Sequence, residues 1–69
     1  MKKTIDLFCD IVDNYGDIGV VYRLGKELYN RNYKVKIFVN KLNEVSKIIK
    51  GFNSSLPYQV HNGIEFFDF

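Results

Sequence analysis

The sequence of 69 residues contains one cysteine, one histidine, one proline and no tryptophan. A single cysteine excludes an internal disulfide, and no cluster of cysteine and histidine has the spacing of a metal site. No apolar run approaches the roughly 20 residues that a transmembrane helix requires. Asp6 and Asp10 interrupt the stretch after the two N-terminal lysines, which is unlike a signal peptide. These absences favour a cytoplasmic protein without a membrane anchor.

The composition is that of a globular protein, with 46% hydrophobic and 16% aromatic residues. The net charge is +2 and the lysines are dispersed, whereas a nucleic-acid-binding surface needs clustered basic residues. The chain is short for a sheet that must be covered on both faces. Residues 64–69 are strand-like and aromatic, so we expect a piece of a larger protein.

Alternation of apolar residues predicts a strand over 4–12, with Ile5, Leu7, Cys9 and Ile11 on one face. From Ile18 onward the period changes to that of a helix, with Val21, Leu24 and Leu28 as its apolar stripe. Residues 34–39 alternate again as a second strand. Strand, helix and strand in this order predict an α/β fold built on a parallel, Rossmann-like βαβ unit.

The second half of the sequence predicts smaller elements. Asn40 is placed to cap a helix that ends at Gly51 and whose apolar stripe is Leu42, Val45, Ile48 and Ile49. Residues 53–57 form a loop. Short strands over 58–60 and 64–67 flank Asn62-Gly63, a dipeptide typical of a hairpin turn.

Asp13 and Asp17 lie four residues apart in the turn between the first strand and the helix. Ligand sites of α/β proteins form at the carboxyl ends of strands. Two carboxylates there favour a cation, a proton or a positively charged substrate as ligand. Neighbouring acidic groups also raise the pKa of one of them, which suits a general base.

Three simpler interpretations of this turn compete with catalysis. Asp17 is placed to cap the helix, where the dipole favours negative charge. Gly16 and Gly19 suggest a phosphate-binding turn, but the glycine patterns of nucleotide-binding loops are absent and carboxylates repel phosphate. Asp10, Asp13 and Asp17 without histidine or cysteine suit only a weak Mg²⁺ or Ca²⁺ site.

Residues 6–20 read DLFCDIVDNYGDIGV and are followed by Tyr22-Arg23-Leu24. This run resembles the N-terminus of the protein-arginine rhamnosyltransferases that modify elongation factor P. The motif is long and uninterrupted and covers about the first third of the chain. Beyond Lys26 the likeness is one of element order.

The resemblance implies the N-terminal, acceptor-side part of an inverting glycosyltransferase with the GT-B fold, in which two Rossmann-like domains face a cleft. Members transfer rhamnose from dTDP-β-L-rhamnose to an arginine of elongation factor P, without a metal or another cofactor. A carboxylate suits this acceptor because it pairs with the planar guanidinium in a bidentate way. The family's two motif aspartates fall on Asp13 and Asp17, the second as general base. The residues expected to shape the pocket floor are Asn14, Tyr15, Gly16 and Gly19.

The sequence departs from the family pattern at Tyr22, where tryptophan is usual, and at Gly25, where alanine is common. The donor-binding C-terminal domain is absent from residues 1–69, so we expect no transferase activity from this chain alone. The alternative is a non-catalytic, truncated Rossmann-like fragment that binds a partner through sheet edges and aromatic residues. Of the remaining residues, Cys9 is expected to be a packed thiol, His61 to lie in a loop or at a strand end, and Arg23 to pair with a carboxylate or to face solvent.

Overall fold

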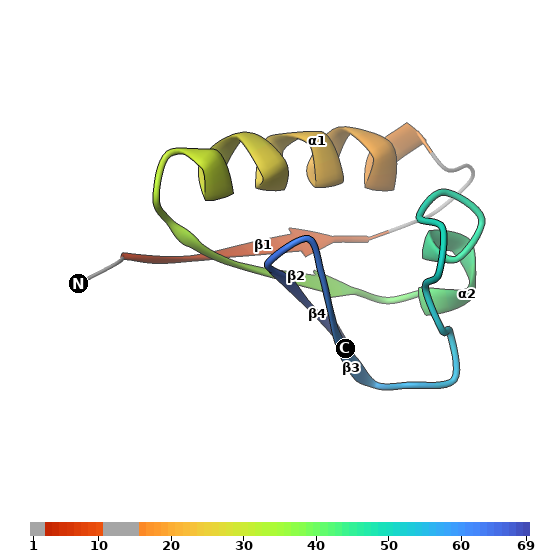
Figure 1. Ribbon diagram of the computed structural model, residues 1–69. Coiled ribbons are helices and arrows are strands. Elements are labelled where there is room, and N and C mark those ends of the chain that lie inside the picture. Colours follow the sequence, from red (N-terminus) through yellow and green to blue (C-terminus); the bar gives the residue numbers. More distant parts are fainter. Residues whose placement is uncertain (1–2, 11–15) are drawn as a thin grey trace.

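The computed structural model describes residues 3–10 and 16–69, with side chains from residue 18 onward in the second range. One long helix lies over one face of a sheet, and a short helix lies at the end of the sheet (Figure 1). None of the helices in the described part of the chain is long and apolar enough to cross a membrane. The elements are β1 (Thr4–Cys9), α1 (Gly16–Asn30), β2 (Lys34–Val39), α2 (Leu42–Val45), β3 (Tyr58–His61) and β4 (Ile64–Asp68).

The described strands form one mixed sheet in the order β1-β2-β4-β3. β1 pairs with β2 in parallel from Thr4↔Lys34 to Cys9↔Val39, and β2 pairs with β4 in parallel. β3 joins β4 in antiparallel register, which confirms the predicted hairpin. The βαβ unit predicted from the sequence is therefore correct, and an antiparallel edge strand completes the sheet.

The hydrophobic core lies between α1 and the sheet and extends to the segment after α2. The alternation of side chains along each strand produces this core, because every second residue of β2 and β4 points toward α1. The buried residues are Cys9, Ile18, Val35, Ile37, Val39, Leu42, Val45, Ile49, Phe52, Ile64 and Phe66.

The helical stripe differs from the prediction at one position. Val21 and Leu28 pack against the core as expected, but Leu24 is 47% exposed. Gly25 occupies the sheet-facing position instead, where a Cβ would lie 3.2 Å from Cδ1 of Ile37. The prediction failed because an apolar residue was preferred to a glycine, although the glycine is what lets α1 approach the sheet closely.

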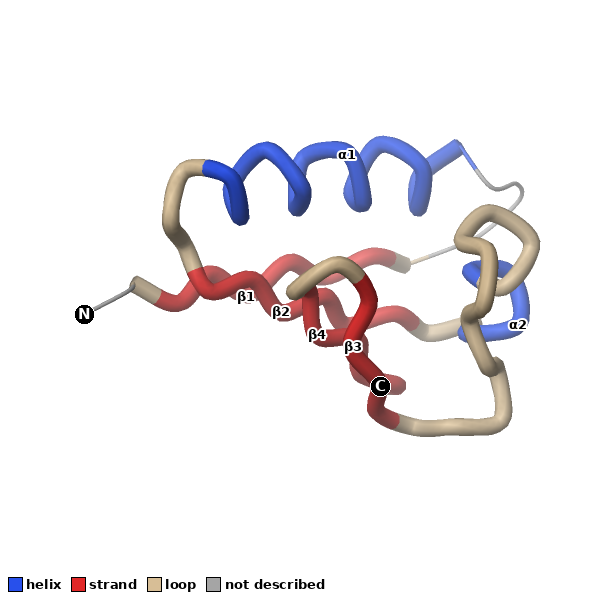
Figure 2. The backbone as a smooth tube through the Cα atoms, in the orientation of Figure 1, coloured by secondary structure: helices blue, strands red, loops and turns tan. Residues whose placement is uncertain are grey.

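Two element boundaries also differ. β1 ends at Cys9, and Asp10 is outside the strand; the predicted extension to residues 11 and 12 lies outside the described residues. The second helix is only four residues long and continues as turns, with Gly51 in the left-handed region at φ +85°. Leu42, Val45 and Ile49 are buried as predicted, whereas Ile48, the fourth residue of the predicted stripe, is 38% exposed. The chain continues as turns after Val45, so the spacing of a regular helix does not hold there. The long loop from here to β3 begins at the end of the sheet where α2 lies (Figure 2).

The turn of the β3–β4 hairpin is held against α1. Asn62 and Gly63 both have positive φ, 53° and 81°, as a type I′ turn requires. The side-chain amide of Asn62 donates a hydrogen bond to the hydroxyl of Tyr22 at 2.7 Å. The ring of Tyr29 packs so closely on Gly63 that a Cβ there would lie 2.3 Å from its Cζ. The hairpin and the helix are thus fixed to one another by two tyrosines.

Candidate active site

The carboxyl ends of β1 and β2 and the N-terminus of α1 lie at the same end of the molecule (Figure 1). This follows from the parallel pairing of β1 with β2, because α1 must run back across the sheet between them. Residues that follow either strand therefore lie at the end of the molecule where α1 begins. The candidate site predicted from the sequence falls at this end.

The structure places only part of the predicted site. Asp13, Asn14 and Tyr15 lie outside the described residues. Gly16 is the first residue of α1 and Asp17 the second. Asp17 therefore belongs to the first turn of the helix and does not occupy the N-cap position, so that prediction was wrong.

Gly19 is the fourth residue of α1 and is partly buried. A Cβ added there would meet no described atom within 4 Å. Packing within the described structure thus does not require a glycine at this position. The role expected for Gly19, close approach of a substrate to the backbone, stays a prediction.

Sequence reasoning missed a hydrogen bond that joins the ends of the two parallel strands. The amide Nδ2 of Asn40 donates to Oδ1 of Asp10 at 2.5 Å, although Asn40 was expected to cap α2. The residue in the capping position is Lys41, whose side chain makes no capping hydrogen bond. The signal was available, because Asp10 and Asn40 directly follow strands whose last pair is Cys9↔Val39. Their bond fixes one carboxylate at the edge of the candidate site.

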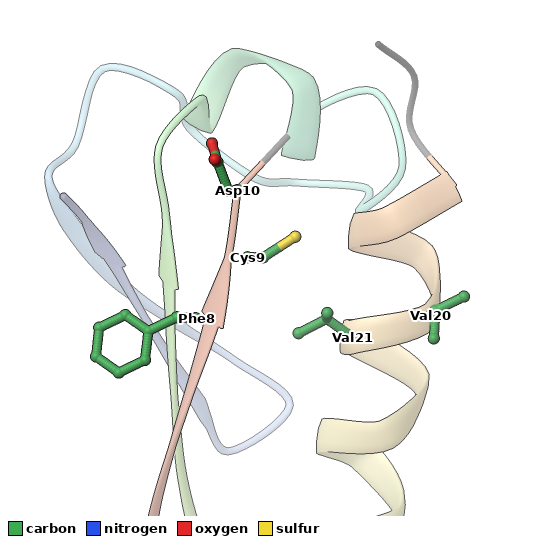
Figure 3. Close-up of a pocket in the computed structure, with 5 residues that line it drawn as sticks. All are labelled: Phe8, Cys9, Asp10, Val20 and Val21. Carbon is green, nitrogen blue, oxygen red and sulfur yellow. The ribbon is translucent and has the colours of Figure 1, made fainter. Parts of the chain in front are cut away.

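A depression of about 310 Å³ lies beside this carboxylate (Figure 3). Cys9 on β1 and Val21 on α1 point toward one another, whereas Phe8 points to the other face of the strand. Cys9 is 3% exposed, which confirms the expected packed cysteine. The remaining lining residues are Asp10 and Val20.

Basic side chains line a second depression, of about 260 Å³, along α1. Arg23 is exposed there, consistent with the solvent-facing alternative, and Lys26 places its Nζ 4.8 Å from the centre of the Tyr22 ring. Gly19 and Ile48 complete the lining with Tyr22. Arg23 and Lys26 thus give this face of α1 a positive charge.

His61 is the last residue of β3, as expected of a strand-end histidine. Its ring stacks on Phe52 with 5.1 Å between centres, and its Nε2 lies 2.6 Å from Oε1 of Gln59. The same oxygen accepts a hydrogen bond from the backbone N–H of Asn53. These contacts hold the loop before β3 in place. His61 therefore has a packing role.

Within residues 3–10 and 16–69, no group of three or more histidine, cysteine, aspartate or glutamate residues is placed to hold a metal ion. The described residues form a small α/β domain with acidic residues at the carboxyl end of β1 and in the first turn of α1, and ligand sites of α/β domains form at that end of the sheet.

Comparison with known proteins gives this domain a family. The model of the elongation factor P (EF-P) rhamnosyltransferase EarP family matches residues 5–69, and the chain belongs to this family. A protein-arginine rhamnosyltransferase of Shewanella oneidensis is 45% identical over 60 residues, which is 86% of this chain and 15% of that protein. A protein-arginine rhamnosyltransferase of Pseudomonas putida is 38% identical over 66 residues, which is 94% of this chain and 18% of that protein. A protein-arginine rhamnosyltransferase of Pseudomonas aeruginosa is 34% identical over 61 residues, which is 87% of this chain and 16% of that protein. The chain therefore spans less than a fifth of the length of these relatives.

Proposed function

We propose that this chain forms the acceptor-side, N-terminal part of an inverting GT-B glycosyltransferase of the cytoplasm. The enzyme transfers rhamnose from dTDP-β-L-rhamnose to an arginine side chain of EF-P. The observation that carries the proposal is the family match over residues 5–69. The placement of Asp10 and Asp17 at one end of the parallel strands agrees with it, since an acceptor cation requires negative charge there.

In this proposal Asp17 is the general base and Asp13 shares or orients the guanidinium. A guanidinium nitrogen bonds to the anomeric carbon of rhamnose while the bond from that carbon to the phosphate oxygen of dTDP breaks. The nitrogen loses its proton to the carboxylate as the new bond forms. Because free guanidinium is almost always protonated, the carboxylate acts late and its first contribution is orientation. The residues proposed to shape the acceptor pocket are Asn14, Tyr15, Gly16 and Gly19.

The starting position of α1 gives Asp17 a rigid support. Asp17 is the second residue of a 15-residue helix that packs on the sheet through Ile18, which is fully buried. A side chain on such an element is held more accurately than one in a loop. The helix dipole also stabilises the charged carboxylate of a first-turn residue.

A chimera tests the proposal. The 60-residue matching segment of the Shewanella oneidensis protein is replaced by the matching residues of this chain, and the chimera is incubated with dTDP-β-L-rhamnose and EF-P. We expect mass spectrometry to find one rhamnose on an EF-P arginine, and we expect the 69-residue chain alone to give none. A folded chimera that binds the donor and leaves EF-P unmodified would contradict the proposal.

A further inference from the structure

A side-chain hydrogen bond continues the parallel pairing of β1 and β2 by one residue. The last backbone pair is Cys9↔Val39. Asp10 directly follows β1 and Asn40 directly follows β2. The bond from Nδ2 of Asn40 to Oδ1 of Asp10, 2.5 Å long, has a carboxylate as its acceptor. Hydrogen bonds to charged groups are shorter and stronger than those between neutral groups. The chain leaving β1 is therefore tied to the chain leaving β2.

The carboxyl ends of these two strands differ in their support. β2 lies between β1 and β4, and the backbone N–H of Phe69 donates to the carbonyl oxygen of Val39 at 3.2 Å. β1 is the first strand of the described sheet, where β2 is its neighbour on one side. Segments with fewer contacts open more readily than the middle of a sheet. The side chain of Asn40 thus extends the support of a central strand to the end of β1.

The direction of the Asp10 side chain fits a tie and not a ligand-binding group. Asp10 contributes to the lining of the depression between β1 and α1. Figure 3 shows that Cys9 is directed toward Val21 of α1, whereas the Asp10 carboxylate is directed away from α1. Its hydrogen bond goes to Asn40, at the end of the neighbouring strand. Asp10 is therefore placed to hold the backbone at this point.

We propose that Asn40 is a positioning residue for rhamnose transfer and acts through Asp10. The inference rests on the proposed function, in which Asp13 and Asp17 form the acidic acceptor site. Asp10 precedes Asp13 by three residues, so the tie lies where the chain enters that site. On the other side of the site, α1 is held by the buried side chain of Ile18. Loss of the tie displaces the reacting carboxylates from the guanidinium, and a misplacement of about 1 Å costs about 10²-fold in rate.

Exchange of the two side chains tests this role in the chimera described above. Asn40→Asp places two carboxylates against one another, and they repel at a pH well above the ordinary range of carboxyl pKa values. We expect kcat for EF-P modification to fall about 10–100-fold while KM for EF-P changes less than about threefold. Adding Asp10→Asn restores one donor and one acceptor at the same net charge. The double variant should therefore regain kcat to within about threefold of the unsubstituted chimera.

The exchange also separates positioning from binding. If Asp10 itself bound the acceptor, Asp10→Asn alone would raise KM and the double variant would stay impaired, which would overturn the proposal. Asn40→Asp with the kcat of the unsubstituted chimera would overturn it as well and leave the proposed function standing. A chimera that transfers no rhamnose without any substitution would refute the proposed function and the positioning role together.

Hydrogen exchange in the 69-residue chain tests the tie without depending on activity. We expect the backbone amides of residues 8–10 to exchange at least about tenfold faster in Asn40→Ala, because the end of β1 opens more often. Equal exchange in Asn40→Ala and in the unsubstituted chain would overturn the proposal.

Asn62→Gly is the matched control for hydrogen exchange. It removes another hydrogen bond of an asparagine amide, the one to Tyr22 at 2.7 Å, and glycine accepts the positive φ of this position. Asn62 lies just before β4, at the opposite end of the parallel strands. We expect exchange at residues 8–10 to be unchanged in this variant. The same acceleration in Asn62→Gly as in Asn40→Ala would show a loss of overall stability and would overturn the proposal.

Discussion

Gly63 shows how one residue joins two layers of the molecule. Its backbone is in the left-handed region at φ +81°, and the space that a Cβ would fill is occupied by the Tyr29 ring. Two separate costs therefore oppose any larger residue. The first is backbone strain and the second is displacement of an aromatic side chain that α1 contributes.

Gly63→Ala is expected to lower the free energy of unfolding by about 2–5 kcal/mol, the sum of left-handed strain and overpacking. Gly51→Ala is the matched control, because Gly51 has φ +85° but open space around its Cβ position. It should cost only about 1–2 kcal/mol. Urea denaturation of the variants measures both values. Equal losses at the two glycines would show that Tyr29 does not restrict the hairpin turn.

Tyr58 is a single residue that makes the stability of the chain depend on pH. The hydrogen bond to Glu65, with smaller effects of burial and of the Glu65 charge, raises the pKa of Tyr58 above its ordinary value of 10.0. A raised pKa means that folding favours the protonated phenol, so this stability is present below pH 10 and is lost as the pH rises through the folded-state pKa. We expect the unfolding midpoint to fall above pH 10 more steeply than in Tyr58→Phe. Parallel curves for the two proteins would contradict the assigned hydrogen bond.

At the scale of elements, Gly25 lies at the contact between α1 and the sheet. A Cβ there would lie 3.2 Å from Ile37 Cδ1, 3.5 Å from Val35 Cγ1 and 3.6 Å from Ile64 Cδ1. Only the first distance is tight, and it involves the far end of a flexible side chain. A methyl group therefore fits after a small shift, whereas a larger group does not.

Gly25→Ala is expected to stabilise the chain by about 0.5–1 kcal/mol, because alanine favours the helix by that amount. Gly25→Leu is expected to destabilise it by about 1–3 kcal/mol through overpacking. Thermal unfolding followed by circular dichroism gives the sign for each variant. A destabilising alanine would mean that the interface between α1 and the sheet cannot relax by even a few tenths of an ångström.

The sequence predicted the elements better than their ends. Alternation in β1 and β2 and the Asn62-Gly63 dipeptide specified strands and hairpin, because these signals are local. Leu24 was misassigned because periodicity alone does not distinguish two neighbouring helical positions when the sheet accepts a glycine. The Asn40–Asp10 bond escaped prediction because it depends on the pairing of strands 30 residues apart. Of the predicted site, Asp13, Asn14 and Tyr15 lie outside the described residues and stay predictions.

At the scale of the whole molecule, the two faces of the sheet differ in what they require. One face holds the core with α1, and the other presents Glu65 and the aromatic side chains of Phe8, Phe38, Phe67 and Tyr58. The acidic residues lie at the carboxyl ends of the strands, on the edge between the two faces. The chain thus combines a helix–sheet layer, acidic residues at the carboxyl ends of strands and a second sheet face that carries aromatic side chains.

Rhamnose transfer by the chimera carrying Asp17→Asn tests the central claim most directly. Loss of the proposed base should reduce the rate of EF-P modification about 10²–10⁴-fold while the far-UV circular dichroism is unchanged. Glu27→Gln is the control on the same helix, since Glu27 is exposed and pairs with Arg31 at 3.0 Å. It should keep the unsubstituted rate. Transfer by the Asp17→Asn chimera at the rate of the Glu27→Gln chimera would contradict the assignment of Asp17 and the acidic acceptor site with it.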